Sequence, residues 1–464
     1  MTVTALTVKM KSGSVTSAEL VSTSLETIHE MQPIYNAFIT VDAEGAKKAA
    51  AQLDKELSLG HIRGPLHGIP IAVKDLINTK DIRTTMGSKL YENHLPDADA
   101  TVVTRLKEAG AVILGKTNTH EFAYGPIGDR SYFGACRNPY NPEKIAGGSS
   151  SGSGSAVGAG MVPAAIGTDT GGSIRIPASA CGVVGMKPTF GLVSKSGSFP
   201  LAYTLDHVGP MTGSVSDNAL ILSVIAGHDS ADPYSLNQEN RDYTEKIGDG
   251  LAGKTIGVPD WYFVNVDAEV RKAVEQSLDL FEEMGASVQP VQMPILQEIS
   301  KFQVITIQAE AAAVHQQTLK HKGSVDEEVY ERIVASGTVK GFEYVESQIK
   351  REGIIREYNK VFEKVDVLVT PTLPVLPTDI GQREVRIGEF KETVRSALLR
   401  LTSPTNYTGN PSLSLPCALS ESGLPIGLQL IGKHGTEAEL YQFAYALEQK
   451  VDFRNLVSQS NQLT

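Results

Sequence analysis

A run of small and polar residues, Thr168-Asp-Thr-Gly-Gly-Ser173, carries the strongest chemical signal in this chain. Small residues allow consecutive backbone N–H groups to point into one space, which is what an oxyanion hole requires. Ser173 ends the run, so its hydroxyl would lie beside those donors. The pattern therefore predicts a nucleophile and its electrophilic stabiliser within one peptide segment.

A serine nucleophile needs a base, and histidine is the usual one. None of the ten histidines lies in the glycine-rich segment 147–188. Lys74 is a substitute, because it follows the apolar run 69–73, whose alternation predicts a strand with Ala72 and Lys74 on one side. Burial lowers the pKa of a lysine, so its neutral amine can accept a proton near pH 7.

The same glycine-rich segment permits a second assignment of the nucleophile. Residues 148–152 match the pattern G-x-S-x-G centred on Ser150. In an α/β-hydrolase esterase this pattern requires a strand directly before the serine, whereas residues 138–146 resemble a loop. An esterase that uses Ser150 is therefore kept as an alternative, and Ser150 is otherwise expected to brace the loop.

No metal or cofactor is expected. His120-Glu121 begins like the zinc motif H-E-x-x-H, but position 124 is Tyr. The phosphate-binding and dinucleotide-binding glycine patterns are absent from 147–188. Three scattered cysteines, Cys136, Cys181 and Cys417, favour buried thiols over a disulfide framework.

Alternating helix and strand signals predict an α/β fold with a large, parallel or mixed sheet and helices on both faces. Helices are expected from a capping box at Thr16 and Glu19, over about 100–109 before Gly110, and from a second capping box at Thr436 and Glu439. A further helix, with Val270, Val274, Phe281 and Met284 on one face, is expected to end at Gly285. Strands are expected at 69–73, 111–114, 255–258, from 286, and at 365–369.

Composition excludes several classes of function. The 464 residues carry a formal net charge of −11, which argues against direct binding of nucleic acid. No apolar run reaches the roughly 18 to 20 residues of a membrane span, and the first residues do not resemble a secretory leader. A cytoplasmic enzyme for a small molecule, either monomeric or a homo-oligomer, fits best.

Four blocks of sequence resemble the amidase-signature family over nearly the whole chain. They are Gly68-Ile-Pro-Ile-Ala-Val-Lys74-Asp, Gly147-Gly-Ser149-Ser-Ser-Gly, Gly167-Thr-Asp-Thr-Gly-Gly-Ser173-Ile-Arg and Gly185-Met-Lys-Pro, and Pro425-Ile-Gly-Leu-Gln429 also fits. Lys74 and Ser149 are 75 residues apart and Ser149 and Ser173 are 24 apart, which agrees with the family. The combination is far more specific than any single block.

The resemblance implies a Ser–cis-Ser–Lys triad that forms an acyl-enzyme. Ser173 would attack the carbonyl carbon, and Ser149, preceded by a cis peptide, would relay the proton to Lys74. The implied oxyanion hole is the backbone of Thr170, Gly171, Gly172 and Ser173, and Ala123 maps onto a substrate-contacting backbone position. Its neighbours Tyr124 and Gly125 are weaker candidates for substrate contact, and Asp169 and Arg175 are taken as structural.

The alternating helix and strand signals, together with the resemblance, predict one α/β/α domain over 1–464. Within it we expect N-terminal helices in 1–60, the catalytic core in 61–230, a helical cover in 251–360 and a return to the core in 361–464.

The substrate is the least determined feature. The chain is similar to the glutaminase component of the glutamyl-tRNA(Gln) amidotransferase, in which an arginine at the position of Arg351 holds the glutamine carboxylate. The stretch 391–411 contains Glu392 but lacks that component's aspartate for the glutamine amine. A stand-alone amidase is therefore preferred, with carbamates and anilides as further substrates. The glutaminase component of a tRNA-dependent complex stays an alternative; a non-catalytic scaffold is disfavoured because Lys74, Ser149 and Ser173 are all present.

Overall fold

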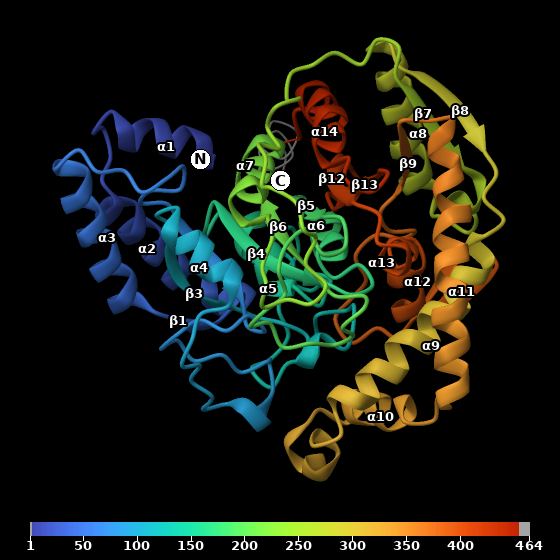
Figure 1. Ribbon diagram of the computed structural model, residues 1–464, viewed down its shortest axis with the longest axis horizontal. Coiled ribbons are helices and arrows are strands. Elements are labelled where there is room, and N and C mark those ends of the chain that lie inside the picture. Colours follow the sequence, from blue (N-terminus) through green and yellow to red (C-terminus); the bar gives the residue numbers. More distant parts are fainter. Residues whose placement is uncertain (1, 454–464) are drawn as a thin grey trace.

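The computed structural model describes residues 2–453 as one α/β unit built on a large twisted sheet (Figure 1). Eleven strands lie in the order β1-β3-β2-β4-β6-β5-β12-β13-β9-β7-β8. Their bounds are β1 (Phe38–Val41), β2 (Pro70–Lys74), β3 (Val112–Thr117), β4 (Ala164–Asp169), β5 (Val184–Lys187), β6 (His207–Thr212), β7 (Thr255–Pro259), β8 (Ser287–Val291), β9 (Val367–Pro371), β12 (Ser412–Leu419) and β13 (Pro425–Ile431). A separate hairpin pairs β10 (Glu384–Ile387) with β11 (Phe390–Thr393).

Helices lie on both faces of this sheet. The α-helices are α1 (Val3–Lys11), α2 (Ser17–Tyr35), α3 (Ala43–Ser58), α4 (Thr101–Glu108), α5 (Ser151–Gly158), α6 (Arg175–Ala180), α7 (Val215–Ile225), α8 (Ala268–Glu283), α9 (Leu296–Val314), α10 (Glu327–Ser336), α11 (Gly341–Asn359), α12 (Val394–Arg400), α13 (Pro404–Thr408) and α14 (Glu437–Val451). Short 3-10 helices are η1 (Lys89–Tyr91), η2 (Glu121–Ala123), η3 (Asp260–Phe263), η4 (Thr318–Ser324) and η5 (Lys360–Glu363).

The sheet is mixed, as the alternation of signals predicted. β2 pairs in parallel with β3 and β4, and β7 pairs in parallel with β8 and β9. Antiparallel pairs connect these two groups, from β4 through β6, β5, β12 and β13 to β9. The N-terminal and C-terminal thirds of the chain therefore belong to one continuous sheet.

The alternation within β2 directs its side chains as expected. Ile71 and Val73 join the hydrophobic cluster that packs under α4 and α7, whereas Ala72 joins the cluster on the opposite face with α2, α3 and α5. Lys74 has the same parity as Ala72. It therefore lies on the face that carries α5.

The segment 296–359 forms helices α9, α10 and α11, which lie along one side of the molecule (Figure 1). Ala311, Val329 and Ile333 from these helices pack with Phe122 and Leu201 in one cluster. The helices therefore contact two segments, 121–125 and 199–206, that matter for the site below.

Most of the expected elements are present, with one local error. The capping box at the start of α2 is formed, with Thr16 N donating to Glu19 Oε2 at 2.8 Å and Glu19 N donating to Thr16 Oγ1 at 3.1 Å. The capping box expected at Thr436 and Glu439 is wrong, although α14 does start there. The reason is competition, since the Thr436 hydroxyl donates to Lys433 O and Glu439 pairs with Lys246.

None of the helices within residues 2–453 is both long enough and apolar enough to cross a membrane.

Candidate active site

Lys74 ends β2 and is fully buried, yet no carboxylate lies within ion-pair distance of it in the described chain. Its Nζ contacts Ser149 Oγ at 2.8 Å and Thr168 Oγ1 at 2.7 Å. Burial lowers the pKa of Lys74 well below its usual value, and the more distant carboxylates of Asp169 and Asp206 oppose that shift without reversing it. Two hydroxyls therefore hold an amine whose neutral form is favoured.

Ser149 and Ser173 approach each other through their backbones. The Gly148–Ser149 peptide bond is cis. The next amide, Ser150 N, donates to Ser173 O at 3.2 Å, which ties the segment that holds Ser149 to the segment that holds Ser173. Both serines are buried, Ser149 completely and Ser173 with 6% of its surface exposed.

The backbone before Ser173 offers hydrogen-bond donors, but fewer than expected. Within residues 2–453 the amides of Thr170, Gly171 and Ser173 donate to no acceptor. The Gly172 amide donates to Asp169 Oδ1 at 2.7 Å, so its expected place in an oxyanion hole is not supported. Its N–H is used to hold the turn instead.

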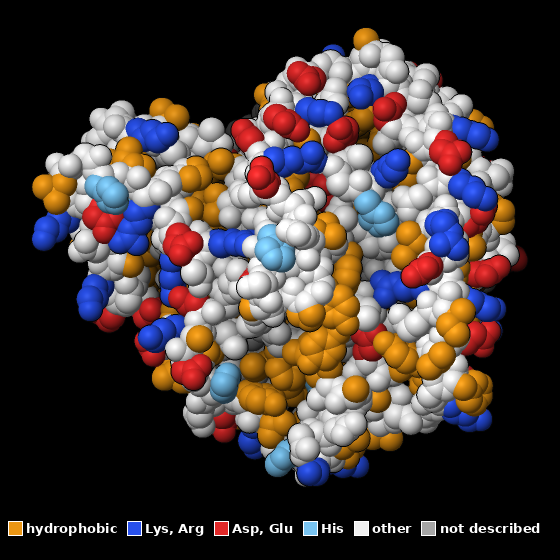
Figure 2. All heavy atoms as spheres, viewed as in Figure 1, with side chains coloured by type: hydrophobic (Ala, Val, Ile, Leu, Met, Phe, Trp, Pro, Cys, Tyr) orange, Lys and Arg blue, Asp and Glu red, His pale blue; other side chains and the backbone are white. Residues whose placement is uncertain are grey.

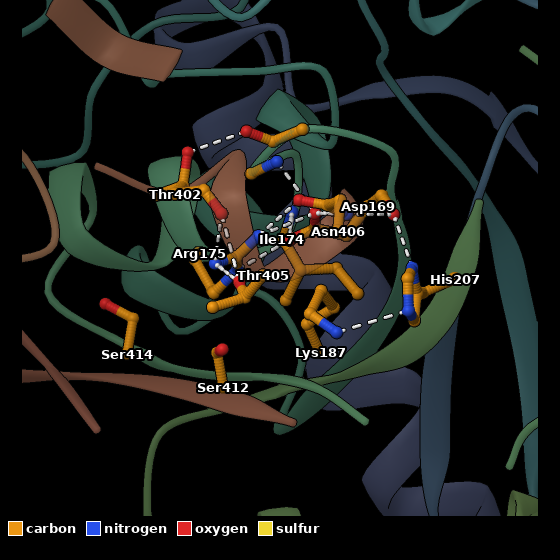
Figure 3. A network of polar contacts seen from close by, with 12 residues as sticks. Asp169, Ile174, Arg175, Lys187, His207, Thr402, Thr405, Asn406, Ser412 and Ser414 are labelled. Carbon is orange, nitrogen blue, oxygen red and sulfur yellow. Dashed lines mark hydrogen bonds and ion pairs between the residues drawn. The ribbon is translucent and has the colours of Figure 1, made fainter. Parts of the chain in front are cut away.

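A buried ion pair shapes this turn (Figure 3). Asp169 accepts from Arg175 Nε at 3.0 Å and from Arg175 Nη2 at 3.0 Å, and both side chains are fully buried. Burial alone would raise the pKa of Asp169, but the Arg175 guanidinium holds it well below its usual range. Arg175 also donates to Thr402 O, Thr405 Oγ1, Asn406 Oδ1 and Gln429 Oε1 at 2.7–2.8 Å. The structural role expected for Asp169 and Arg175 agrees with these contacts.

A cavity of about 230 Å³ adjoins the site. Its lining includes Ala123, Thr168, Thr170 and Tyr203, together with the segments 195–201, 206–208 and 231–234. Figure 2 shows hydrophobic side chains concentrated in the lower middle of the face drawn there, over the loops between the sheet and α9. Ala123 thus lies where a substrate in the cavity would meet it.

The weaker candidates for substrate contact do not line this cavity. The Tyr124 hydroxyl instead bonds to Ser336 Oγ in α10 at 2.6 Å. Gly125 packs against His120, where a Cβ would lie 2.2 Å from the imidazole. Both residues are positioned to build the wall behind Ala123.

Arg351, in α11, donates hydrogen bonds to two backbone carbonyls of the protein. Its Nε donates to Tyr407 O and its Nη2 to Thr204 O, each at 2.8 Å, and its guanidinium lies over the Tyr407 ring. It does not line the cavity, although Thr204 adjoins the lining residue Tyr203. Arg351 therefore connects the helices to the cavity wall.

Neither Thr168 nor Asp206, two residues that contact the candidate site, was singled out from the sequence. Thr168 contacts Lys74, and its place at the start of the Thr168–Ser173 run could have revealed it. Asp206 accepts from Thr170 Oγ1 at 2.6 Å, and burial raises its pKa to about 6. No motif marks Asp206, which directly precedes β6 and lies beside the end of β4 because these two strands pair.

The esterase alternative is wrong. No strand precedes Ser150, which follows a loop and stands at the start of α5. Its hydroxyl donates to Thr168 O at 3.1 Å and accepts from Thr168 N at 3.2 Å. Ser150 thus braces β4.

Comparison with known proteins identifies the family. A family model described as Amidase matches residues 19–441. The A component of the glutamyl-tRNA(Gln) amidotransferase of Geotalea daltonii is 39% identical over 472 residues, which cover 96% of each chain. A solved structure described as a vestigial protein complex that reveals the evolutionary origins of an s-triazine catabolic enzyme superposes with a TM-score of 0.94 at 32% identity, covering 97% of this chain and 98% of that one. A solved amidase gives a TM-score of 0.89 at 36% identity, covering 97% and 100%.

The fold and these matches define an amidase-signature protein, and the chain belongs to the amidase family. It is a hydrolase that acts on carbon–nitrogen bonds of amides. The predicted family and fold class are thereby confirmed.

The first prediction concerns the buried pair. Arg175→Ala leaves the Asp169 carboxylate buried without its cation, so we expect the free energy of unfolding to fall by about 3–5 kcal/mol. Urea unfolding followed by circular dichroism measures the change. Arg356→Ala, which removes an exposed partner of Glu352, is the matched control and is expected to cost at most about 0.5 kcal/mol. Equal midpoints for the two variants would contradict the structural role.

The second prediction concerns Lys74 and pH. Only the neutral amine accepts a proton, so activity rises as pH passes upward through the pKa of Lys74. Because burial lowers that pKa, the rise occurs below the ordinary lysine value of 10.5. Lys74→Ala should reduce amide turnover about 10³–10⁴-fold and remove the rise.

The pH profile of kcat/KM on a primary amide measures both effects. Lys80→Met, which changes an exposed lysine, is the control. An active Lys74→Ala enzyme with an unchanged profile would exclude Lys74 as the base.

Proposed function

We propose that this chain is a stand-alone amidase for small molecules, with Ser173 as nucleophile, Ser149 as proton relay and Lys74 as base. The observation that carries the proposal is the 2.8 Å contact between a buried, carboxylate-free lysine and Ser149. A lysine held in this way is suited to accept a proton. The whole chain is proposed as one catalytic domain that works in the cytoplasm.

The acylation step uses each of these groups once. Ser173 Oγ forms a bond to the substrate carbonyl carbon as its proton passes to Ser149, whose own proton passes to Lys74. The carbonyl π electrons move to oxygen, and the free amides of Thr170, Gly171 and Ser173 are suited to stabilise the oxyanion. The C–N bond then breaks, and the nitrogen leaves with the proton returned through Ser149.

Deacylation repeats the relay with water. Water gives a proton to Lys74 through Ser149 while its oxygen bonds to the acyl carbon. The C–O bond to Ser173 breaks and Ser173 recovers the proton, which releases the acid. The same steps serve any acyl carbon that bears a nitrogen leaving group, so carbamates and anilides remain within reach.

The second candidate function is that of the glutaminase component of a tRNA-dependent amidotransferase, favoured by 39% identity to such a component over nearly the whole chain. Against it stands the region 391–411. Its only carboxylate, Glu392, accepts from Arg400 Nε at 3.0 Å and does not line the cavity. Glu392 is therefore no replacement for an aspartate that would bind the glutamine amine.

The third prediction identifies the nucleophile. A fluorophosphonate should modify Ser173 alone, because Ser173 ends the run whose free amides, those of Thr170, Gly171 and Ser173, are suited to stabilise an oxyanion. Ser173→Ala should abolish labelling, and Ser149→Ala should slow it strongly by breaking the relay. Peptide mapping by mass spectrometry locates the adduct.

Ser150→Ala is the matched control for this experiment, since Ser150 contacts β4 rather than Lys74, and its effect should be much milder. An adduct on Ser149 would mean that the roles of nucleophile and relay are exchanged.

The fourth prediction concerns glutamine. Because no carboxylate of the region 391–411 is placed to receive its α-ammonium, glutamine should be a poor substrate. Hydrolysis of primary amides should need neither partner proteins nor tRNA. A screen of free glutamine, primary amides, anilides and carbamates with the purified chain measures this. Efficient glutamine hydrolysis that requires a complex would favour the second candidate function.

A further inference from the structure

The cavity beside Thr168 and Thr170 contains two polar atoms that the protein leaves without partners. Lys195 Nζ and Ser198 Oγ are both buried and make no hydrogen bond within residues 2–453. Both residues line the cavity and belong to one segment. Burial lowers the pKa of Lys195, but the carboxylates of Asp232, Asp206 and Glu310 oppose that shift and favour its charged form. An ammonium has three donors, so the absence of any hydrogen bond from Nζ in the described chain indicates a missing acceptor.

The position of Lys195 is fixed by its neighbours. Its Nζ lies 4.2 Å from the centroid of the Phe190 ring and 4.5 Å from that of Tyr234. Its backbone N–H donates to Asp232 Oδ2 at 2.8 Å, and Asp232 Oδ1 accepts from Tyr234 N at 3.0 Å. Asp232 thus joins the two loops that hold the ammonium between two aromatic faces.

The carboxylates around the cavity accept hydrogen bonds from uncharged donors. Asp206 accepts from Thr170 Oγ1 and from the amides of Leu201 and Ala202. Glu310 accepts from Thr204 and from the Tyr344 hydroxyl. In the described chain no carboxylate lies within ion-pair distance of Lys195. The carboxylates near the cavity therefore have hydrogen-bond donors, whereas the Lys195 ammonium has neither a hydrogen-bond acceptor nor an ion-pair partner among residues 2–453.

A carboxylate on the substrate would complete this arrangement. It could accept from both Lys195 Nζ and Ser198 Oγ, and charged hydrogen bonds of this kind are the strong ones. The cavity mouth is marked by two exposed lining residues, Tyr203 at 51% and Tyr234 at 38%. An acyl chain that starts beside Thr170 and runs into the cavity would carry its far end to Lys195.

We propose that Lys195 and Ser198 form a carboxylate subsite, and that the preferred substrates are monoamides of short dicarboxylic acids. This inference rests on the proposed function, because it assigns the acyl part of the amide that Ser173 attacks. Arg351 takes no part in this subsite, because it does not line the cavity. An α-ammonium on the acyl chain would approach the same cation, which disfavours glutamine further.

Three matched amides test the subsite. Glutaramate carries the terminal carboxylate, pentanamide replaces it with a methyl group, and glutamine is glutaramate with an α-ammonium. We expect kcat/KM for glutaramate to exceed that for pentanamide by about 10–100-fold, the effect of a charged hydrogen bond. Lys195→Met should reduce that ratio to near one, chiefly through KM, and Lys195→Arg should restore part of it. Ser198→Ala should give a smaller loss.

Lys301→Met is the matched control, since Lys301 also lies over an aromatic ring, Phe302, but on the exposed side of α9. It should leave the ratio unchanged. Calorimetric titration of glutaramate into the Ser173→Ala variant, with and without Lys195→Met, measures binding without turnover.

The outcomes separate the two proposals. Hydrolysis of pentanamide without a preference for glutaramate, or a ratio that Lys195→Met leaves unchanged, would overturn the subsite while the amidase assignment stands. Failure to hydrolyse any amide, with no adduct on Ser173, would overturn the proposed function. If no amide is hydrolysed, calorimetry still tests the subsite: glutaramate binding that Lys195→Met leaves unchanged would overturn it.

Discussion

The ion pair between Asp169 and Arg175 is the constraint on which the site depends. Asp169 ends β4, and Arg175 begins α6, so the pair closes the short turn that contains Ser173. Through Thr402, Thr405 and Gln429, Arg175 also binds segments that are more than 200 residues away in sequence. Two buried charges are costly unless every partner is present, so the turn is stable only when the C-terminal part of the chain is in place.

Lys74 is buried like Arg175, but its surroundings differ. The protein gives Arg175 a carboxylate and four further acceptors, but it gives Lys74 only two hydroxyls. Arginine keeps its charge in proteins, whereas lysine responds to burial by losing its proton. The choice of residue type therefore decides which buried cation is structural and which can take part in proton transfer.

Local patterns in the sequence predicted the features that depend on neighbouring residues, such as strand faces and helix starts. The alternation of Ile71, Ala72 and Val73 indicated the face of β2 on which Lys74 lies, and Thr16 and Glu19 indicated the start of α2. The capping box at Thr436 failed because Lys246, almost 200 residues earlier, pairs with Glu439. Asp206 and the Arg175 network were likewise beyond reach, since each is built by contacts between distant segments. Ser173 and Lys74 were proposed from residue type and position in the sequence, whereas the relay role of Ser149 came only from the family resemblance.

Arg351 has a consequence for how this enzyme can diversify. It attaches α11 to the carbonyls of Thr204 and Tyr407, and Tyr407 directly follows Asn406, whose side chain donates to Asp169. Mutations in α11 that release Arg351 therefore act on the same segment that holds the turn bearing Ser173. The helices beside the cavity and the turn that bears Ser173 are thus connected through α13 (Pro404–Thr408), so substitutions in these helices can change substrate selectivity and reactivity together.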